Sequence, residues 1–316
     1  MSSHSPTAAS SPLASAIKRY LAFLQSEENK SVLTVTNYRQ SLDLLLTLSP
    51  VSDAAKFSKE SVRTCKQRLH EFRTKQGKEL ALRTKNHHLT ILRAFLRYLL
   101  QEEELNVYPP DRIKRFKEEQ RKVKVLSKEE LDRLLAAPDR SKREGKRDRA
   151  ILELFFSTGL RLAELRSLNR KDLNFNTREI SVRGKRNKLR VVFLSDAAVV
   201  SLTEYLDARL DHLHPLFIRN LQKATHELPP GENFRLSRIS IYGIVKKYAR
   251  AAGIVTDPSP HTLRHSFATD LLRSGADLRS VQELLGHKDL STTQIYTHVT
   301  NPQLKEVHRK FHGRSM

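Results

Sequence analysis

The chain has 316 residues, and its 57 Lys and Arg against 35 Asp and Glu give a formal net charge of +22 and a pI near 10.2. This length allows two domains with sizeable cores. So strong a positive charge favours a polyanionic partner, with nucleic acid as the first candidate. A membrane surface is the second candidate, but the sequence carries neither a basic amphipathic anchor nor a lipidation signal.

Several further classes of protein are excluded by simple features. No run of about 18 apolar residues occurs, so no transmembrane helix is expected. Residues 1–12 are rich in Ser, Ala and Pro, and we expect a disordered terminus rather than a secretory signal, because no apolar core follows. Cys65 is the single cysteine, which excludes an internal disulfide and a multi-cysteine zinc site. A cytoplasmic, nucleoid-associated protein is predicted.

Residues 13–108 are predicted to form a helical domain. Apolar residues at helical spacing indicate four helices, at 13–28, 31–48, 58–76 and 81–105, with Gly77 as the stop signal of the third. The fourth helix carries polar residues opposite its leucines: Arg83, His87, Thr90, Arg93 and Arg97. This polar face is either a solvated surface or a set of DNA phosphate contacts, and the charge of the chain favours the second interpretation.

Residues 109–124 are predicted to be a basic linker. Pro109 and Pro110 block continuation of the preceding helix. Basic residues then dominate the segment: Arg112, Lys114, Arg115, Lys117, Arg121, Lys122 and Lys124. A solvated linker and a segment lying along a duplex are compatible interpretations of this run.

A second domain is predicted over residues 125–316. It begins with a capping box at 127–130 and a helix near 147–157. The hydrophobic period then changes, and two strands are predicted at 179–183 and 189–194 around a basic hairpin tip. Helices return from Ser195 onward, and an irregular insertion is expected near 220–235. No internal repeat is found, so the fold class is mainly α with a small β-sheet in the second domain.

The second domain also contains residues suited to attack on a phosphodiester. Such a reaction places extra negative charge on the non-bridging oxygens, which Arg161 and Arg264 can grip with their planar guanidiniums. Lys185, on the hairpin, is the candidate general acid for the leaving oxygen. His261 lies three residues before Arg264 and is placed to take a proton from Tyr296, the candidate nucleophile.

Each of these residues has an ordinary explanation when it is taken alone. A single Tyr near a C-terminus is usually core or surface, and Arg161 could simply pair with Glu164. A second histidine, His287, could add a hydrogen bond to a non-bridging oxygen. The joint occurrence and order of an arginine, a lysine, His-x-x-Arg, Gly-His and a tyrosine favour the catalytic interpretation.

These motifs resemble those of the tyrosine recombinase (phage integrase) family, and the whole chain is similar to a Xer-type member. Residues 158–165 match the first arginine box, 261–265 match the second, and 284–287 with the tyrosine nine residues later match the third. The resemblance implies six catalytic residues and one supporting residue: Arg161, Lys185, His261, Arg264, His287 and Tyr296, supported by Glu164.

The resemblance also implies a mechanism and an architecture. Tyr296 is expected to attack the scissile phosphate and form a 3′-phosphotyrosine link, with strand exchange through a Holliday junction. Bond energy is kept in that link, so neither ATP nor a metal ion is expected. The implied fold is a helical, SAM-like core-binding domain plus an α+β catalytic domain that together form a C-shaped DNA clamp.

The implied partners are double-stranded DNA at a specific recombination site and a homo- or hetero-tetramer on two duplexes. A second recombinase, or a DNA translocase acting as accessory activator, is a further candidate partner. Residues 301–302 could start a C-terminal helix, with Leu304, Val307 and Phe311 at helical spacing. In the family such a tail packs onto the neighbouring protomer, whereas the ordinary alternative is that it covers its own domain.

The chain departs from the family pattern at the hairpin. Arg186 stands where the family usually has a second glycine, and Lys188 and Arg190 compete with Lys185 for the role of catalytic lysine. The insertion near 220–235 is longer than in typical Xer proteins. Candidate DNA contacts come from the fourth helix and the hairpin: Arg83, His87, Arg93, Arg97, Arg186, Lys188 and Arg190.

Four functions remain open. The first is a Xer-like recombinase that resolves chromosome dimers and so serves chromosome partition and cell division, which the compact layout favours modestly. The second is a mobile-element integrase or excisionase. The third is a type IB topoisomerase-like enzyme, which would relax supercoils without a specific site. The fourth is a DNA-binding protein without catalysis.

Overall fold

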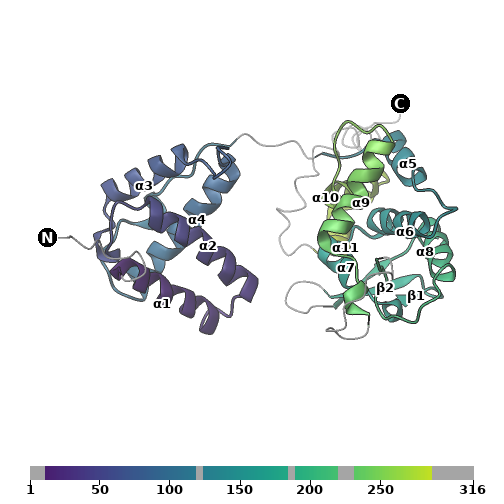
Figure 1. Ribbon diagram of the computed structural model, residues 1–316, viewed down its shortest axis with the longest axis horizontal. Helices are drawn as coiled ribbons and strands as arrows, with labels where there is room; N and C mark the ends of the chain where they lie inside the picture. Colours follow the sequence, from purple (N-terminus) through teal and green to yellow (C-terminus); the bar gives the residue numbers. More distant parts are fainter. Residues whose placement is uncertain (1–10, 119–123, 184–188, 220–230, 287–316) are drawn as a thin grey trace, which may run out of the picture. The chain divides into compact units, whose positions relative to one another are not determined.

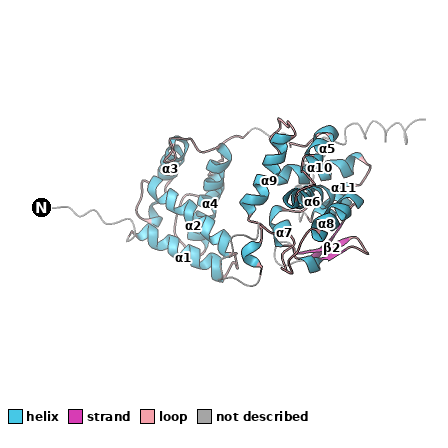
Figure 2. Cartoon of the chain, turned by 45° about the vertical axis from the view of Figure 1, so that its right-hand side comes forward, coloured by secondary structure: helices cyan, strands magenta, loops and turns pink. Residues whose placement is uncertain are grey.

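The computed structural model describes residues 11–118, 124–183, 189–219 and 231–286. Two compact units make up the chain, Met1–Arg121 and Lys122–Met316, and each has a hydrophobic core of its own. The division falls inside the predicted linker at 109–124. Both units are mainly helical, and the strands belong to the second unit (Figure 2).

The first unit is built from four α-helices, as the sequence predicts: α1 (Pro12–Ser26), α2 (Val32–Leu48), α3 (Lys59–Glu71) and α4 (Leu82–Gln101). Serine side chains at positions 11, 31 and 58 accept hydrogen bonds from the first turns of α1, α2 and α3. Such caps satisfy backbone N–H groups that have no partner within the helix. The apolar faces of the four helices share one core.

Two predicted helix ends in this unit were wrong. α3 ends at Glu71 rather than near Gln76, and Arg73 and Glu79 form an antiparallel bridge around a turn. Gly77 has φ of +74° within that turn, so it is a turn glycine and not the stop signal of a helix. α4 ends at Gln101 rather than at residue 105, and Glu104 takes a positive φ of 52°.

The first turns of α4 hold the segment that follows the helix. Asn86 exchanges two hydrogen bonds with the backbone of Phe116, at 2.9 Å from its amide nitrogen and 2.7 Å to its carbonyl oxygen. Ile113 is buried in the core of the first unit, and Pro110–Arg112 forms a short 3-10 helix. The first part of the predicted linker therefore packs onto the helices of this unit.

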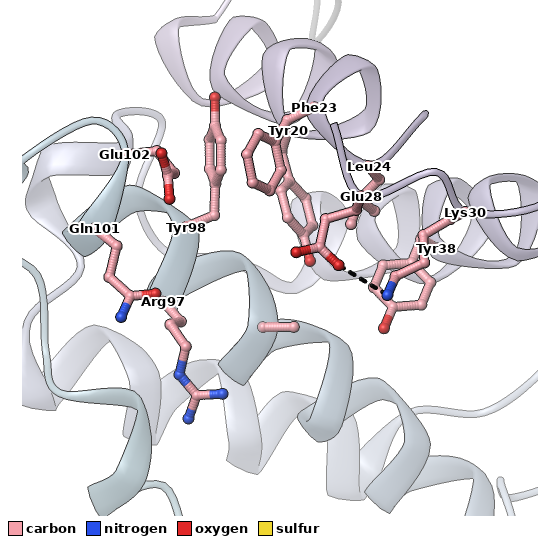
Figure 3. A pocket seen from close by; sticks show the side chains of 11 residues that line it. Tyr20, Phe23, Leu24, Glu28, Lys30, Tyr38, Arg97, Tyr98, Gln101 and Glu102 are labelled. Carbon is pink, nitrogen blue, oxygen red and sulfur yellow. Dashed lines mark ion pairs between the residues drawn. The ribbon is translucent and has the colours of Figure 1, made fainter. Parts of the chain in front are cut away.

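A hollow of about 240 Å³ opens between α1, α2 and α4 (Figure 3). Its walls are aromatic, and the rings of Tyr20 and Tyr98 lie 4.9 Å apart between centroids. An ion pair of 2.8 Å joins Lys30 to Glu28 among the lining residues. This lining is chemically mixed, with no convergent set of charges.

The second unit contains seven α-helices and a small sheet within the described residues (Figure 1). The helices are α5 (Lys128–Ala136), α6 (Arg143–Thr158), α7 (Leu162–Ser167), α8 (Asp196–Asp207), α9 (Arg238–Ala251), α10 (Pro260–Arg273) and α11 (Leu278–Leu285). The predicted capping box before α5 is present, with Ser127 and Glu130 as its two members. Across the described parts of both units, no helix is both long enough and apolar enough to span a membrane.

The sheet has three antiparallel strands in the order β1 (Leu173–Asn174), β2 (Glu179–Arg183) and β3 (Leu189–Phe193). The two predicted strands are therefore confirmed as a hairpin, with Val182 opposite Arg190. Val182 and Val192 face the core that α6 and α8 also line. The hairpin tip, residues 184–188, lies outside the described residues.

The insertion predicted near 220–235 is described only from residue 231 onward. Glu232–Phe234 forms a short 3-10 helix, and Arg235 after it is buried. Its guanidinium donates hydrogen bonds of 2.9 and 2.8 Å to the carbonyl oxygens of Arg166 and Leu168. Arg235 therefore satisfies carbonyl groups at the C-terminal end of α7.

Candidate active site

Arg161 lies immediately before α7 and begins the candidate site. Its own backbone N–H donates to the carboxylate of Glu164 at 2.8 Å, which fixes the first turn of the helix. Its guanidinium reaches the same carboxylate at 2.9 Å from Nη1 and the carbonyl oxygen of Gly286 at 3.2 Å from Nη2. The side chain stays 37% exposed, so the guanidinium is also open to solvent.

The ordinary pairing of Arg161 with Glu164 is therefore present, but it is part of a larger cluster. Arg190 on β3 grips both oxygens of the same carboxylate, at 2.8 Å from Nη1 and 3.0 Å from Nη2. Burial raises the pKa of Glu164, but hydrogen bonds from Arg190 and Arg161 outweigh it, so the net pKa is lowered. The carboxyl group is thus ionised and shared by two guanidiniums.

Arg264 lies in the first half of α10 and is buried, with 3% of its surface exposed. Its Nη1 donates to the carbonyl oxygen of Gly159, and its Nη2 donates to the carbonyl oxygen of Leu285 at 2.6 Å. The bonded carbonyls belong to the C-terminal ends of α6 and α11. These hydrogen bonds join the second arginine box, residues 261–265, to the first box, residues 158–165, and to the third, residues 284–287.

Glycines at two helix ends allow this close packing. Gly159 has φ of +59°, and a Cβ there would lie 2.4 Å from Cδ1 of Phe267. Gly286 has φ of +63°, and a Cβ there would lie 3.1 Å from Cδ and Nη1 of Arg190. Both positions have a left-handed backbone that disfavours a side chain, and at Gly159 a Cβ would also clash with Phe267, whereas at Gly286 the Arg190 side chain would have to shift slightly.

His261 and His265 project from α10 near the two arginines. Although His261 stays exposed, partial desolvation first, and then the charges of Arg264 and Arg161, lower its pKa. Burial, His261 and Arg264 lower the pKa of His265 to about 4. Both imidazoles are therefore neutral at pH 7, and a neutral imidazole can accept a proton.

The structure brings together three of the six predicted catalytic residues, Arg161, His261 and Arg264, with the supporting Glu164. The other three, Lys185, His287 and Tyr296, lie outside the described residues, as do Arg186 and Lys188. The predicted helix from residue 301, with Leu304, Val307 and Phe311, is also outside them. The site as described therefore ends at Gly286, directly before the predicted histidine.

The polar face of α4 is where the sequence places it, in the first unit. Arg83, His87 and Thr90 are exposed. Arg93 and Arg97 both pair with Asp111, at 3.2 and 2.9 Å. Their role as phosphate contacts stays a prediction.

The sequence does not reveal the partners of two arginines, Arg190 in the site and Arg235 at the C-terminal end of α7. The sequence favours Arg190 as a DNA contact or as a competitor for the catalytic lysine position, whereas its hydrogen bonds to Glu164 make it part of the arginine cluster. Arg235 was hidden in the apparently irregular insertion. The alternation of β3 gave a signal for Arg190, because it shares a strand face with the buried Val192.

Over the described ranges, no three His, Cys, Asp or Glu side chains are grouped in a way that could hold a metal ion. The positive charge of the candidate site comes from guanidiniums, and each of these planar groups can donate hydrogen bonds to two phosphate oxygens at once.

The chain matches known proteins over nearly its whole length. The Phage integrase family matches residues 124–302, and the N-terminal SAM-like domain of phage integrases matches residues 17–103. A tyrosine recombinase XerD from Listeria monocytogenes is 37% identical over 300 residues, covering 95% of this chain and 99% of the relative. A tyrosine recombinase XerC from Pelotomaculum thermopropionicum is 38% identical over 304 residues, covering 95% and 98%.

A solved structure shares the fold. It is a XerH site-specific recombinase bound to a palindromic difH substrate in a post-cleavage complex, with a TM-score of 0.68 and 22% identity. The match covers 94% of this chain and 85% of that one. With both of its units matched in order and its arginine boxes joined in one cluster, the chain belongs to the phage integrase family of tyrosine recombinases.

Proposed function

We propose that this tyrosine recombinase cuts and rejoins duplex DNA at a specific site, with Tyr296 as the nucleophile. The observation that carries the proposal is the convergence of two arginines on one turn. Arg161 and Arg264 bond the adjacent carbonyls of Gly286 and Leu285, at 3.2 and 2.6 Å. That turn leads directly into His287 and the segment that holds Tyr296.

The chemistry follows from the residue types. The Tyr296 oxygen attacks the scissile phosphorus, and neutral His261 takes the phenolic proton. The bond to the 5′ oxygen breaks, and Lys185 gives that oxygen a proton. Arg161, Arg264 and His287 stabilise the added charge on the non-bridging oxygens. The 5′ hydroxyl of the partner strand then attacks the phosphotyrosine, which reverses these proton transfers and releases Tyr296.

The role in the cell is proposed from the relatives. Their names are XerD and XerC, and the match extends over nearly all of their length. We therefore propose a Xer-like function at a chromosomal site, with four protomers on two duplexes. The polar face of α4 and the hairpin supply phosphate contacts, and a second recombinase or a translocase is a candidate activator.

Covalent capture from a genomic pool tests this proposal. Wild type and Tyr296→Phe are incubated with nicked suicide duplexes made from genomic fragments, denatured, and the attached DNA is sequenced. Retention of one chromosomal locus by wild type alone supports the Xer-like role. Retention of element ends indicates an integrase, and retention of unrelated sequences together with relaxation of supercoils indicates a topoisomerase-like enzyme. Native binding without retention indicates a DNA-binding protein that does not cut.

A further inference from the structure

Arg190 has a position that neither the catalytic chemistry nor a DNA contact explains. It projects from β3, where its backbone is paired with Val182 of β2. Its guanidinium makes two parallel hydrogen bonds to Glu164, at 2.8 and 3.0 Å. The side chain is only 15% exposed, and the carboxylate that it grips is 6% exposed.

The geometry points to Arg190 as a positioning residue, which orients Arg161 for the scissile phosphate by holding their shared carboxylate, Glu164. This inference rests on the proposed function, because Arg161 needs orienting only if it grips a phosphate. A positioning residue of this kind acts through another side chain and does not touch the substrate.

Arg161 and Arg190 share one carboxylate oxygen of Glu164. Oε1 of Glu164 accepts from Nη1 of Arg161 at 2.9 Å and from Nη1 of Arg190 at 2.8 Å. A buried carboxylate needs compensating charge, since an unpaired buried charge is costly. Arg190 supplies a full bidentate partner, so Arg161 is not required to neutralise Glu164 alone. The guanidinium of Arg161 therefore makes a single hydrogen bond to the carboxylate and stays partly exposed.

Arg190 also lies beside Gly286, in the turn before His287. A Cβ at Gly286 would lie 3.1 Å from Cδ and Nη1 of Arg190. The carbonyl oxygen of the same Gly286 accepts a hydrogen bond from Arg161. Arg190 thus packs beside the turn that Arg161 bonds, and its removal would loosen both the carboxylate and the turn.

Arg190 also connects Glu164 to the β2–β3 hairpin. Arg190 stands on β3, two residues after Lys188, at the end of the tip that carries Lys185. Because β3 is paired with β2 through five residue pairs, its Arg190 is held at a fixed place in the sheet. The two hydrogen bonds to Glu164 therefore tie β3 to the arginine that would bind the phosphate.

The test separates the rate of cleavage from the affinity for DNA. Covalent complex formation on a suicide duplex is measured at saturating protein, and Kd is measured with an uncut duplex. We expect Arg190→Gln to slow covalent complex formation roughly a hundredfold with little change in Kd, because misplacement of a positioned group by about 1 Å costs that much. Arg190→Lys keeps the positive charge but cannot make both hydrogen bonds to Glu164. We therefore expect it to slow covalent complex formation less than Arg190→Gln does.

Two further variants supply the controls. Arg250→Gln removes an exposed positive charge from the last turn of α9 in the same unit, and we expect it to cleave at the wild-type rate. In a Glu164→Gln background, Arg190→Gln is expected to cost little more, because residues that act as a unit are not additive. Thermal unfolding of each variant shows whether the protein is folded at the assay temperature. A slower cleavage by a folded variant is then not caused by unfolding.

The outcomes distinguish this inference from the proposed function. If wild type captures no DNA, the proposed function fails and the role of Arg190 fails with it. If wild type captures DNA and Arg190→Gln cleaves it at the wild-type rate, only the role of Arg190 is overturned. An Arg190→Gln effect confined to Kd, or fully additive with Glu164→Gln, would make Arg190 a DNA contact instead.

Discussion

Arg264 donates a hydrogen bond from its buried guanidinium to the carbonyl oxygen of Gly159, which lies 105 residues earlier in the chain. This bond joins the helix that carries the second arginine box to the turn that begins the first. The other end of the same guanidinium bonds Leu285, directly before Gly286. The Arg264 side chain thus connects three segments of the site: α10, the turn at Gly159 and the end of α11.

Replacing Arg264 by Lys should reduce both stability and cleavage. Lysine lacks the fork needed to bond both carbonyl groups, and a buried acceptor left without a partner costs about 1–3 kcal/mol. Urea unfolding measures the first effect, and suicide-substrate cleavage at saturating protein measures the second. Arg238→Lys, at an exposed position of α9, should change stability by less than about 0.5 kcal/mol. Equal stability of the two variants would contradict the account of Arg264 as a clamp.

Gly159→Ala should destabilise the second unit far more than Gly253→Ala. Both glycines have positive φ, +59° and +65°, so both substitutions carry a backbone strain of about 1–2 kcal/mol. Only at Gly159 would the added Cβ meet another atom, Cδ1 of Phe267 at 2.4 Å, whereas nothing lies within 4 Å at Gly253. Thermal unfolding of the two variants isolates the steric cost, and equal losses would show that Phe267 simply moves aside.

Asp111→Asn should tighten DNA binding if the polar face of α4 contacts phosphates. The Asp111 carboxylate pairs with both Arg93 and Arg97, so its removal frees two guanidiniums. Glu27→Gln, an exposed carboxylate beside the end of α1, controls for the change in net charge. Kd is measured by titration over a range of salt concentrations. Equal effects of the two variants would mean that Arg93 and Arg97 lie away from the DNA.

Salt itself should weaken DNA binding steeply. Each phosphate contact releases counterions, so log K falls linearly with log salt, and the loss of one contact lowers the slope by about one. Arg97→Gln should therefore flatten the slope as well as reduce affinity. A slope equal to that of wild type would remove Arg97 from the set of phosphate contacts.

The stability of the protein should fall on mild acidification because of His265. Its folded pKa is lowered to about 4 from an ordinary value of 6.5, so the unfolded state takes up the proton first as pH drops. The stabilisation is complete above pH 6.5 and is lost as pH falls toward 4, by about 3 kcal/mol at most. His265→Gln should show a shallower decline of Tm between pH 7 and pH 5. A decline as steep as that of wild type would contradict this assignment.

Sequence patterns predicted the larger elements because those patterns are local. The four helices of the first unit and the strands β2 and β3 follow from apolar spacing and from stop signals such as Pro50, and the capping box before α5 follows from Ser127 and Glu130. Gly77 misled the prediction of α3, because a glycine suits a helix end and a tight turn equally well. Only the bridge between Arg73 and Glu79 distinguishes the two.

The polar residues of the site were predictable by type but not by partner. Arg161 and Glu164 are three residues apart, so their pairing was foreseeable. The bond from Arg264 to Gly159 and the fork from Arg190 to Glu164 join segments far apart in sequence, and no local pattern encodes them. Lys85 illustrates the same limit in the first unit, since it is buried and donates to the carbonyl oxygen of His70 at 2.7 Å.

In the proposed reaction, Tyr296 forms a covalent bond to the 3′ phosphate at the cut site. The direct measurement is to trap wild type on a suicide duplex, digest the complex with protease and nuclease, and identify the nucleotide-bearing peptide by mass spectrometry. We expect one modified peptide, carrying a 3′-linked nucleotide on Tyr296, and none from Tyr296→Phe. A nucleotide on another residue, or an undiminished covalent complex with Tyr296→Phe, would contradict it.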